Sequence, residues 1–378
     1  MGSQRSPTPA LAAEPPRCGG PGTRHTRVHE EEDTQTMTDA VDTSTGARAA
    51  VAAPRAHDEV LERLNTLTRD TYQLWDHEWV GFSWRNYTYD HVRRVRNLAL
   101  SLAAEEGADP RVLDVAAVLH DITKSYDGEI LMKDGQRVVD EQGFWRNEML
   151  PPARQNRVTA LYDALGLRGA VHNVSGARIA DALLADDGYA PEFRAHVSEI
   201  IISHLKVGQG SSLEGRCLYD ADTIDANIGH PALYRNIQIS MHFLEQQYAA
   251  EGRDTEAYIA ENLRTHLQEY VHSKWPGWVA GKTRDFVGRM TTDAGRRRAL
   301  ARIARLEETL RAMAEEMDEF SAAVESGYLA PTAYFVGSRR NPSLIEELAV
   351  LEARWPAGSH HAASCFISIM RREGDGEL

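Results

Sequence analysis

Residues 213–229 read LEGRCLYDADTIDANIG, and this stretch, a predicted helix that carries several carboxylates among apolar residues, decides the fold class. Helical spacing continues on the N-terminal side of it, where apolar residues recur at steps of three or four. Two such series are Val60, Leu64, Leu67 and Val92, Val95, Leu98, Leu102. Strand-like alternation is nearly absent, so the sequence predicts an all-α protein.

Helix boundaries are indicated at three points where a cap residue precedes a proline at the first helical position. These pairs are Asp109-Pro110, Ala190-Pro191 and Asn341-Pro342. A polar interval from Ser125 to Gln142 lacks helical periodicity, and we interpret it as an insertion with a small hairpin around Asp134-Gly135.

Three segments are predicted along the 378 residues. Residues 1–55 hold six of the fifteen prolines and none of the twenty-eight Phe, Trp and Tyr residues, so they are predicted to form a disordered tail, and Met37 is an alternative start. Residues 56–250 are predicted to form the helical core. Residues 251–378 are predicted to form a helical extension that packs on the core or on a second copy, with the apolar stripe Ile303, Leu306, Leu310, Met313 and Met317.

Composition excludes several classes of protein. Apolar residues make up 42% and charged residues 26%, which is typical of globular proteins. The net charge of −14 disfavours extended nucleic acid as a partner but allows a small phosphate in a local basic pocket. No apolar run reaches the ~18 residues that a membrane span needs. The three cysteines are widely spaced, so we expect a cytoplasmic protein with no membrane partner.

The most informative feature is an ordered series of histidines and aspartates at predicted helix ends. It comprises His91, the pair His120-Asp121 in VAAVLHDITKS (residues 115–125), His172, His204 and the aspartates Asp220 and Asp222. Each residue alone could be an ordinary core or capping residue. Together they would be costly to bury unpaired among apolar residues, and a bound metal would supply the missing partner. Without cysteine ligands, the set suits Mn, Fe, Ni, Co, Zn or Mg.

The order H…HD…D, with LHDITK and DADTID as its central motifs, resembles the HD superfamily of metal-dependent phosphohydrolases. The resemblance covers roughly Tyr89 to Gly229 and implies that residues 56–250 are an HD-domain core. It implies four metal ligands, which are His91, His120, Asp121 and Asp222, with Asp220 as the alternative to Asp222. Asp225 could support the ligands or be solvated, and we favour the solvated interpretation.

Two further histidines extend the resemblance to the longer H…HD…H…H…D form. His172 and His204 fall where that form places ligands of a second metal, so the site is predicted to hold one or two divalent ions. With a single ion, one of these histidines could instead act as a general acid.

The resemblance implies a phosphohydrolase of the phosphomonoesterase or phosphodiesterase type. A divalent ion lowers the pKa of bound water to about 7 and so provides a metal-activated hydroxide. The expected substrate is a small phosphorylated metabolite or nucleotide. Lys124 is the best candidate to bind a phosphate oxygen, and Arg94 is a second, although it could also belong to a solvated basic face with its neighbours on the helix.

Two other functions remain open from the sequence. HD-type di-iron oxygenases share the fold and the six-ligand pattern, so a di-iron oxygenase acting on a small polar substrate is the alternative enzyme. A non-catalytic helical interaction protein is the second alternative, and the complete ligand set disfavours it. The amphipathic helix in the extension also makes a homodimer one expected assembly.

Overall fold

The computed structural model describes residues 56–77, 79–80, 83–133, 136–138, 147–254, 268–318, 344–354 and 361–378. The predicted tail, residues 1–55, lies outside the described residues. The long helices of the predicted core are α1 (His57–Tyr72), α2 (Arg85–Glu106), α3 (Pro110–Leu119), α4 (Arg157–Ala164), α5 (His172–Asp186), α6 (Pro191–Ser203), α7 (Leu213–Asn227) and α8 (His230–Ala250). The fold is all-α, as predicted.

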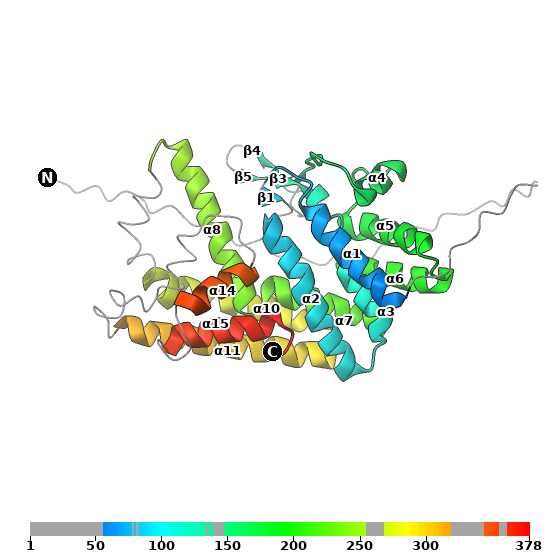
Figure 1. The fold of residues 1–378 in the computed structure, drawn as a ribbon. Helices are drawn as coiled ribbons and strands as arrows, with labels where there is room; N and C mark the ends of the chain where they lie inside the picture. Colours follow the sequence, from blue (N-terminus) through cyan, green and yellow to red (C-terminus); the bar gives the residue numbers. More distant parts are fainter. Residues whose placement is uncertain are drawn as a thin grey trace, which may run out of the picture.

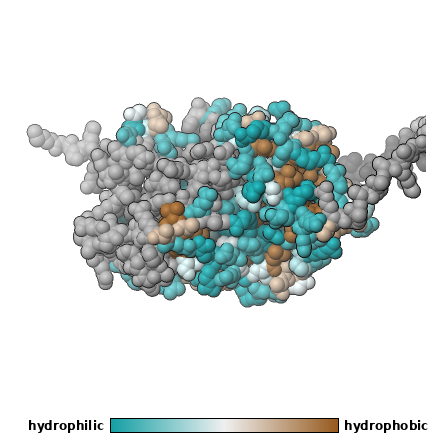
Figure 2. All heavy atoms as spheres, in the orientation of Figure 1, coloured by the Kyte–Doolittle hydropathy of each residue, from teal (hydrophilic) through white to brown (hydrophobic). Residues whose placement is uncertain are grey.

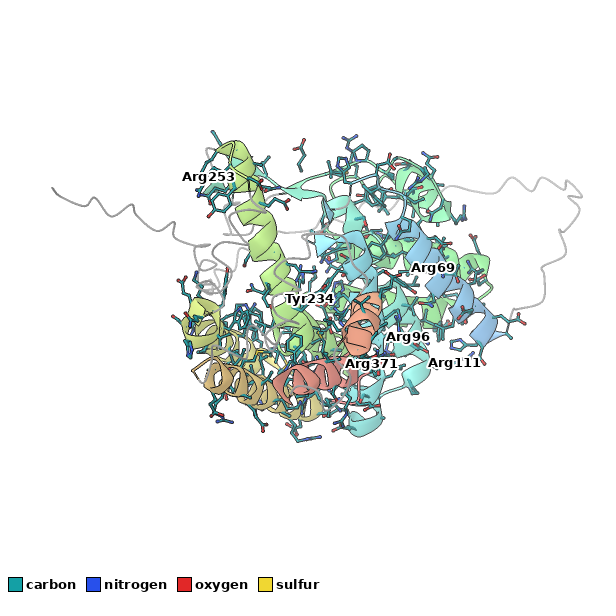
Figure 3. The ribbon with its side chains drawn as sticks, turned by 60° about the vertical axis from the view of Figure 1, so that its left-hand side comes forward. Arg69, Arg96, Arg111, Tyr234, Arg253 and Arg371 are labelled. Carbon is teal, nitrogen blue, oxygen red and sulfur yellow. The ribbon has the colours of Figure 1, made fainter. Side chains whose placement is uncertain are left out.

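Helix α3 lies at the centre of the core, in contact with α1, α2, α5, α6 and α7. Its residues from Val115 to Leu119 are all fully buried, which explains why the sequence there is a continuous apolar run. Helices α2 and α7 pack closely on each other, and α5 packs on α6 in the same way (Figure 1). An ion pair between Arg96 of α2, labelled in Figure 3, and Asp114 of α3 joins these two helices.

Helix ends carry the residues that the sequence singled out. Asp109 is the N-cap of α3 and its carboxylate accepts a hydrogen bond from Arg111 N, as the Asp109-Pro110 pair predicts. The Ala190-Pro191 pair likewise begins α6, whereas Asn341-Pro342 lies outside the described residues. His120 and His204 are the C-cap residues of α3 and α6, so both imidazoles lie where a helix ends.

Two glycines allow the helices that bear these ends to approach closely. A Cβ atom on Gly176 of α5 would lie 3.3 Å from the carbonyl oxygen of His120. A Cβ atom on Gly215 of α7 would lie 3.1 Å from the Cβ of Ser203, next to His204. Because only glycine leaves this space, the backbones of α5 and α7 can lie against the ends of α3 and α6.

The interval after α3 forms a short 3₁₀-helix, η1 (Lys124–Asp127), and four two-residue strands. These are β3 (Glu129–Ile130), β4 (Met132–Lys133), β5 (Gln136–Arg137) and β6 (Asn147–Glu148). Strands β4 and β5 pair antiparallel on either side of residues 134–135, so the predicted hairpin is confirmed. A further pair, β1 (Trp79–Val80) and β2 (Ser83–Trp84), precedes α2.

The described C-terminal elements are helical and pack on the core of the same chain. They are η2 (Tyr270–Lys274), α10 (Trp275–Phe286), η3 (Val287–Arg289), α11 (Asp293–Asp318), α14 (Leu344–Arg354) and α15 (His361–Gly374). Helices α11 and α15 lie side by side and both contact α2 (Figure 1). Ile303, Leu306, Leu310 and Met313 of the predicted stripe are buried in a hydrophobic cluster that also includes residues of α2, α3 and α7.

Where Figure 2 colours the described residues, the surface is mostly hydrophilic, with scattered hydrophobic patches. Apolar side chains gather inside, as Tyr234 of α8 illustrates, since it is fully buried and its hydroxyl accepts a hydrogen bond from Gln238 (Figure 3). Within the described part of the chain, no helix combines the length and the apolar character that crossing a membrane requires.

Asp220 connects the core to the C-terminal helices. Its buried carboxylate accepts hydrogen bonds from Thr291 N and Thr292 N at 2.9 and 2.8 Å and from both threonine hydroxyls at 3.0 and 2.6 Å. Thr292 in turn caps the start of α11 by accepting a bond from Gly295 N. The first aspartate of the DAD motif is therefore a structural residue.

We expect Asp220→Ala to lower the free energy of unfolding by roughly 2 to 4 kcal/mol, because it leaves several buried donors at the start of α11 without an acceptor. Urea unfolding followed by circular dichroism measures this change. Asp186→Ala is the matched control, since it removes only an exposed ion pair with Arg157 and should cost less than about 1 kcal/mol. Equal losses in the two variants would contradict the structural role of Asp220.

Candidate metal centre

The structure brings six of the predicted side chains together in two adjoining groups of three. The first group is His91, His120 and Asp222, and the second is Asp121, His172 and His204. In each group the potential ligand atoms all lie within 4.8 Å of one another. These residues come from α2, α5 and α7 and from the ends of α3 and α6. Asp222, not Asp220, faces this centre.

The Asp121 carboxylate lies between the two groups. Its Oδ1 is 3.4 Å from Nε2 of His172 and 3.5 Å from Nε2 of His204. Its Oδ2 is 3.7 Å from Nε2 of His120 and 3.9 Å from Nε2 of His91. One carboxylate can therefore contribute an oxygen to each group, which would allow it to bridge two ions.

All four imidazoles are held in the same way, with Nδ1 next to an acceptor and Nε2 turned toward the centre. His120 and His204 donate from Nδ1 to the carbonyl oxygens of Ala117 and Ile201, at 2.7 and 2.6 Å. Carboxylates face Nδ1 of the other two, since Nδ1 of His91 is hydrogen-bonded to Asp225 at 2.6 Å, and Nδ1 of His172 lies at ion-pair distance, 2.8 Å, from Asp127. Ligand histidines are typically oriented by such contacts.

Two of the inner nitrogen atoms lie close to each other in this buried site. Nε2 of His172 lies only 3.2 Å from Nε2 of His204, whose Nδ1 faces the carbonyl oxygen of Ile201. His120 Nε2 and Asp121 Oδ1 are buried without a hydrogen-bond partner among the described residues. Converging lone pairs in a buried site require a cation, so the donor set fits a divalent metal.

Burial and neighbouring charges give the histidines very different proton affinities. Burial alone would lower the pKa of His91, but hydrogen bonds to Asp222 and Asp225 raise its pKa to about 9. Burial lowers the pKa of His120 to about 4. Burial would raise the pKa of the Asp121 carboxyl, yet the Lys124 ammonium and the surrounding imidazoles lower its pKa well below the ordinary value.

Lys124 lies at the centre, as predicted for a phosphate-binding group. Its Nζ donates to Nε2 of His172 at 3.2 Å and is 3.8 Å from Oδ1 of Asp121. Its side chain is 21% exposed, whereas the Asp121 side chain is 3% exposed. The Lys124 side chain is therefore more exposed than the Asp121 carboxylate beside it.

Arg94 is placed differently from the prediction. Its guanidinium is buried and donates from Nε and Nη2 to the two oxygens of Asp225, at 2.9 and 3.0 Å. This bidentate pair orients Asp225, which in turn holds Nδ1 of His91. Because its guanidinium is buried, Arg94 does not belong to a solvated basic face, so that alternative is wrong for this residue.

Asp225 was expected to be solvated, and that interpretation is wrong. Its side chain is 1% exposed, and the pKa of its carboxyl, which burial would raise, is strongly lowered by the charge of Arg94. A buried carboxylate at i+3 from Asp222 faces the same side of α7 as that ligand. The residue that sequence reasoning missed altogether is Asp127, which lies at i+3 from Lys124 but within the insertion, where no periodicity indicated its direction.

The helical scaffold turns four imidazoles and two carboxylates toward one buried centre. This arrangement is typical of helical proteins that bind metals. Residues 88–227 match the family model of the HD domain. The chain therefore contains an HD domain, in agreement with the resemblance seen in its motifs.

Similar solved structures include two crystal structures of Bacillus subtilis YpgQ, at 17% sequence identity, each covering 68% of this chain. One covers 96% of the YpgQ chain, and the other, in complex with ADP, covers 95%, both with a TM-score of 0.32. Comparison with curated proteins gave no match.

In metal-depleted protein, we expect His91 to be protonated at both ring nitrogens below about pH 9 and His120 to stay neutral down to about pH 4. A histidine titrates to its charged form as the pH falls through its pKa, so at pH 7 only His91 of this pair carries a charge. Imidazole ¹⁵N chemical shifts measured against pH test this, with His91→Gln for assignment. Titration of both rings near pH 6.5 would contradict the described environments.

Proposed function

We propose that this chain is a metal-dependent phosphohydrolase that removes or cleaves a phosphate ester in a small phosphorylated metabolite or nucleotide. The observation that carries the proposal is the pair of adjoining ligand groups that share Asp121, next to an accessible lysine ammonium. A bound divalent ion supplies an activated water at neutral pH and neutralises phosphate oxygens. The HD domain found in residues 88–227 belongs to a family with this type of chemistry.

The proposed ligands are His91, His120 and Asp222 in one group and His172 and His204 in the other, with Asp121 shared. The carbonyl contacts of His120 and His204 favour the tautomer with the proton on Nδ1, so that Nε2 of each ring can face a metal without reorientation. If only one ion binds, His172 or His204 is available as a general acid for the leaving oxygen.

Lys124 is proposed to bind a phosphate oxygen of the substrate. Its ammonium is within 3.8 Å of Asp121 and is partly exposed, so it can contact a substrate that reaches the metal. For Arg94 the contacts favour a positioning role, because Asp225 occupies two of its nitrogens. The metal's identity, a cytoplasmic location, a homodimer and the division at residue 250 stay predictions.

Metal content and phosphate release together test the proposal. We expect the full chain to bind at least one divalent ion and to release phosphate from one or more nucleotides or sugar phosphates with Mn or Co added. Asp121→Ala should lower both the bound metal and the rate by more than about a hundredfold, because it removes the shared ligand. Asp114→Ala, which removes a carboxylate paired with Arg96 away from the ligand groups, is the control.

Two outcomes would overturn the proposal. Equal turnover by wild type and Asp121→Ala would remove the centre from the chemistry. Oxygen consumption by the anaerobically iron-loaded protein with a polyol or an aminophosphonate, without phosphate release from any ester, would favour the di-iron oxygenase instead.

The carboxylate behind His91 gives a second prediction. We expect Asp225→Asn to weaken the affinity for the metal by roughly tenfold to a hundredfold, because the neutral amide no longer pairs with Arg94 and raises the basicity of His91 less. Competition with a chelating dye measures the affinity. Asp114→Asn alters the comparable ion pair with Arg96, which lies on α2 as Arg94 does. This variant should leave the affinity for the metal within about twofold. The same loss in both variants would contradict a specific role for Asp225.

A further inference from the structure

The second ligand group, which is Asp121, His172 and His204, has a cation of the protein itself beside it. The Lys124 ammonium donates from Nζ to Nε2 of His172 at 3.2 Å and lies 3.8 Å from Oδ1 of Asp121. These two atoms are themselves 3.4 Å apart, and Nε2 of His172 is 3.2 Å from Nε2 of His204. Lys124 therefore contacts two of the three side-chain atoms with which this group could hold an ion.

An ammonium and a metal ion cannot use Nε2 of His172 at the same time. A lysine ammonium has three donors and no acceptor, so Nε2 is the acceptor in this hydrogen bond. An imidazole nitrogen that accepts has a single lone pair in the plane of the ring, and the same lone pair forms the bond to a metal. Binding of an ion to His172 therefore requires that the Lys124 ammonium moves away.

The charge of Lys124 also does part of what an ion would do for Asp121. Burial would raise the pKa of the Asp121 carboxyl, and the Lys124 ammonium is the largest of the neighbouring charges that lower it. A carboxylate that is only 3% exposed needs such a positive charge to remain ionised in the interior. The ammonium thus stabilises the second ligand group in the same electrostatic sense as a bound cation.

The first ligand group differs in this respect. Among the described residues, the ion-pair contacts of Asp222 are with the imidazoles of His91 and His120, at 3.0 and 3.9 Å, and not with a lysine or an arginine. The buried guanidinium of Arg94 donates to Asp225 instead. An ion that enters the first group therefore meets no ammonium on its ligand atoms, whereas an ion that enters the second group does.

The Lys124 side chain can move without the backbone that carries it. It is 21% exposed, so it borders the solvent, and a lysine has a flexible four-carbon stem. The backbone N–H of Lys124 donates to the carbonyl oxygen of Asp121 at 2.8 Å, which holds the start of η1 in place. Rotation of the stem is therefore enough to take the ammonium off His172.

We propose that Lys124 is an internal cation that takes the place of an ion in the second ligand group. The first group then binds its ion without competition from a lysine, whereas the second group binds one only when the ammonium moves away. The released ammonium stays next to the centre, where it can contact a phosphate oxygen of the substrate. This last step rests on the proposed phosphohydrolase function, whereas the competition between Lys124 and an ion does not.

Titration of the full chain with Mn²⁺ tests the proposal without any turnover. Two Mn²⁺ ions that share a carboxylate are magnetically coupled, so electron paramagnetic resonance distinguishes one bound ion from two. We expect wild type to bind the first ion at least about tenfold more tightly than the second. Lys124→Met, which keeps the length of the side chain but not its charge, should tighten binding of the second ion about tenfold and change that of the first less than about threefold.

Two further variants are the controls. Lys124→Arg keeps the positive charge and the donors, so its second ion should bind no more tightly than that of wild type. Lys274→Met removes a lysine of similar exposure, 27%, that pairs with Glu269 at 3.1 Å outside the ligand groups. It should leave both affinities within about twofold. A cooperative melting transition in each variant establishes that it is folded.

Three results would overturn the role of Lys124 as an internal cation. They are an affinity for the second ion that is unchanged or weaker in Lys124→Met, an equal gain in Lys124→Arg, and the absence of a second ion from every variant. The two proposals can fail separately. Phosphate release with unchanged binding of the second ion leaves the hydrolase and removes the competition. Tighter binding of the second ion in Lys124→Met, without phosphate release from any ester by wild type, leaves the competition and removes the hydrolase.

Discussion

The rest of the site depends on one electrostatic constraint, which is that lone pairs from several buried side chains converge on a small volume. Nε2 of His204 and Nε2 of His172 face each other at 3.2 Å, and the Lys124 ammonium donates to Nε2 of His172. Nearby, Nε2 of His120 and Oδ1 of Asp121 are buried without a hydrogen-bond partner in the described part of the chain. Such an arrangement is unfavourable in a medium of low dielectric unless a cation accepts the lone pairs.

The helical scaffold satisfies this constraint through the ends of its helices. At the C-terminus of a helix, the last carbonyl groups lack partners within the helix, and a histidine placed there can donate Nδ1–H to one of them. His120 and His204 both do so, which leaves Nε2 free to face inward. The carboxylate of Asp225 is hydrogen-bonded to Nδ1 of His91, and the carboxylate of Asp127 lies 2.8 Å from Nδ1 of His172.

The residues that meet at the centre could be predicted from the sequence, because their order along helical segments is distinctive. The partners of those residues were harder to predict. Asp225 shares its helix face with Asp222, but the sequence did not indicate that Arg94 would neutralise it in the interior. Asp127 belongs to a 3₁₀ turn that has no periodic pattern, so its direction depends on tertiary packing alone.

Helix α7 uses two of its sides at once, and this has a consequence for dissecting the protein. Asp222 and Asp225 face the ligand groups, while Asp220 receives its four hydrogen bonds from Thr291 and Thr292. A shortened chain that ended after residue 250 would keep all six ligand side chains. It would leave the Asp220 carboxylate without its four donors, on an apolar surface that the C-terminal helices no longer cover. A minimal catalytic fragment therefore has to include at least the start of α11.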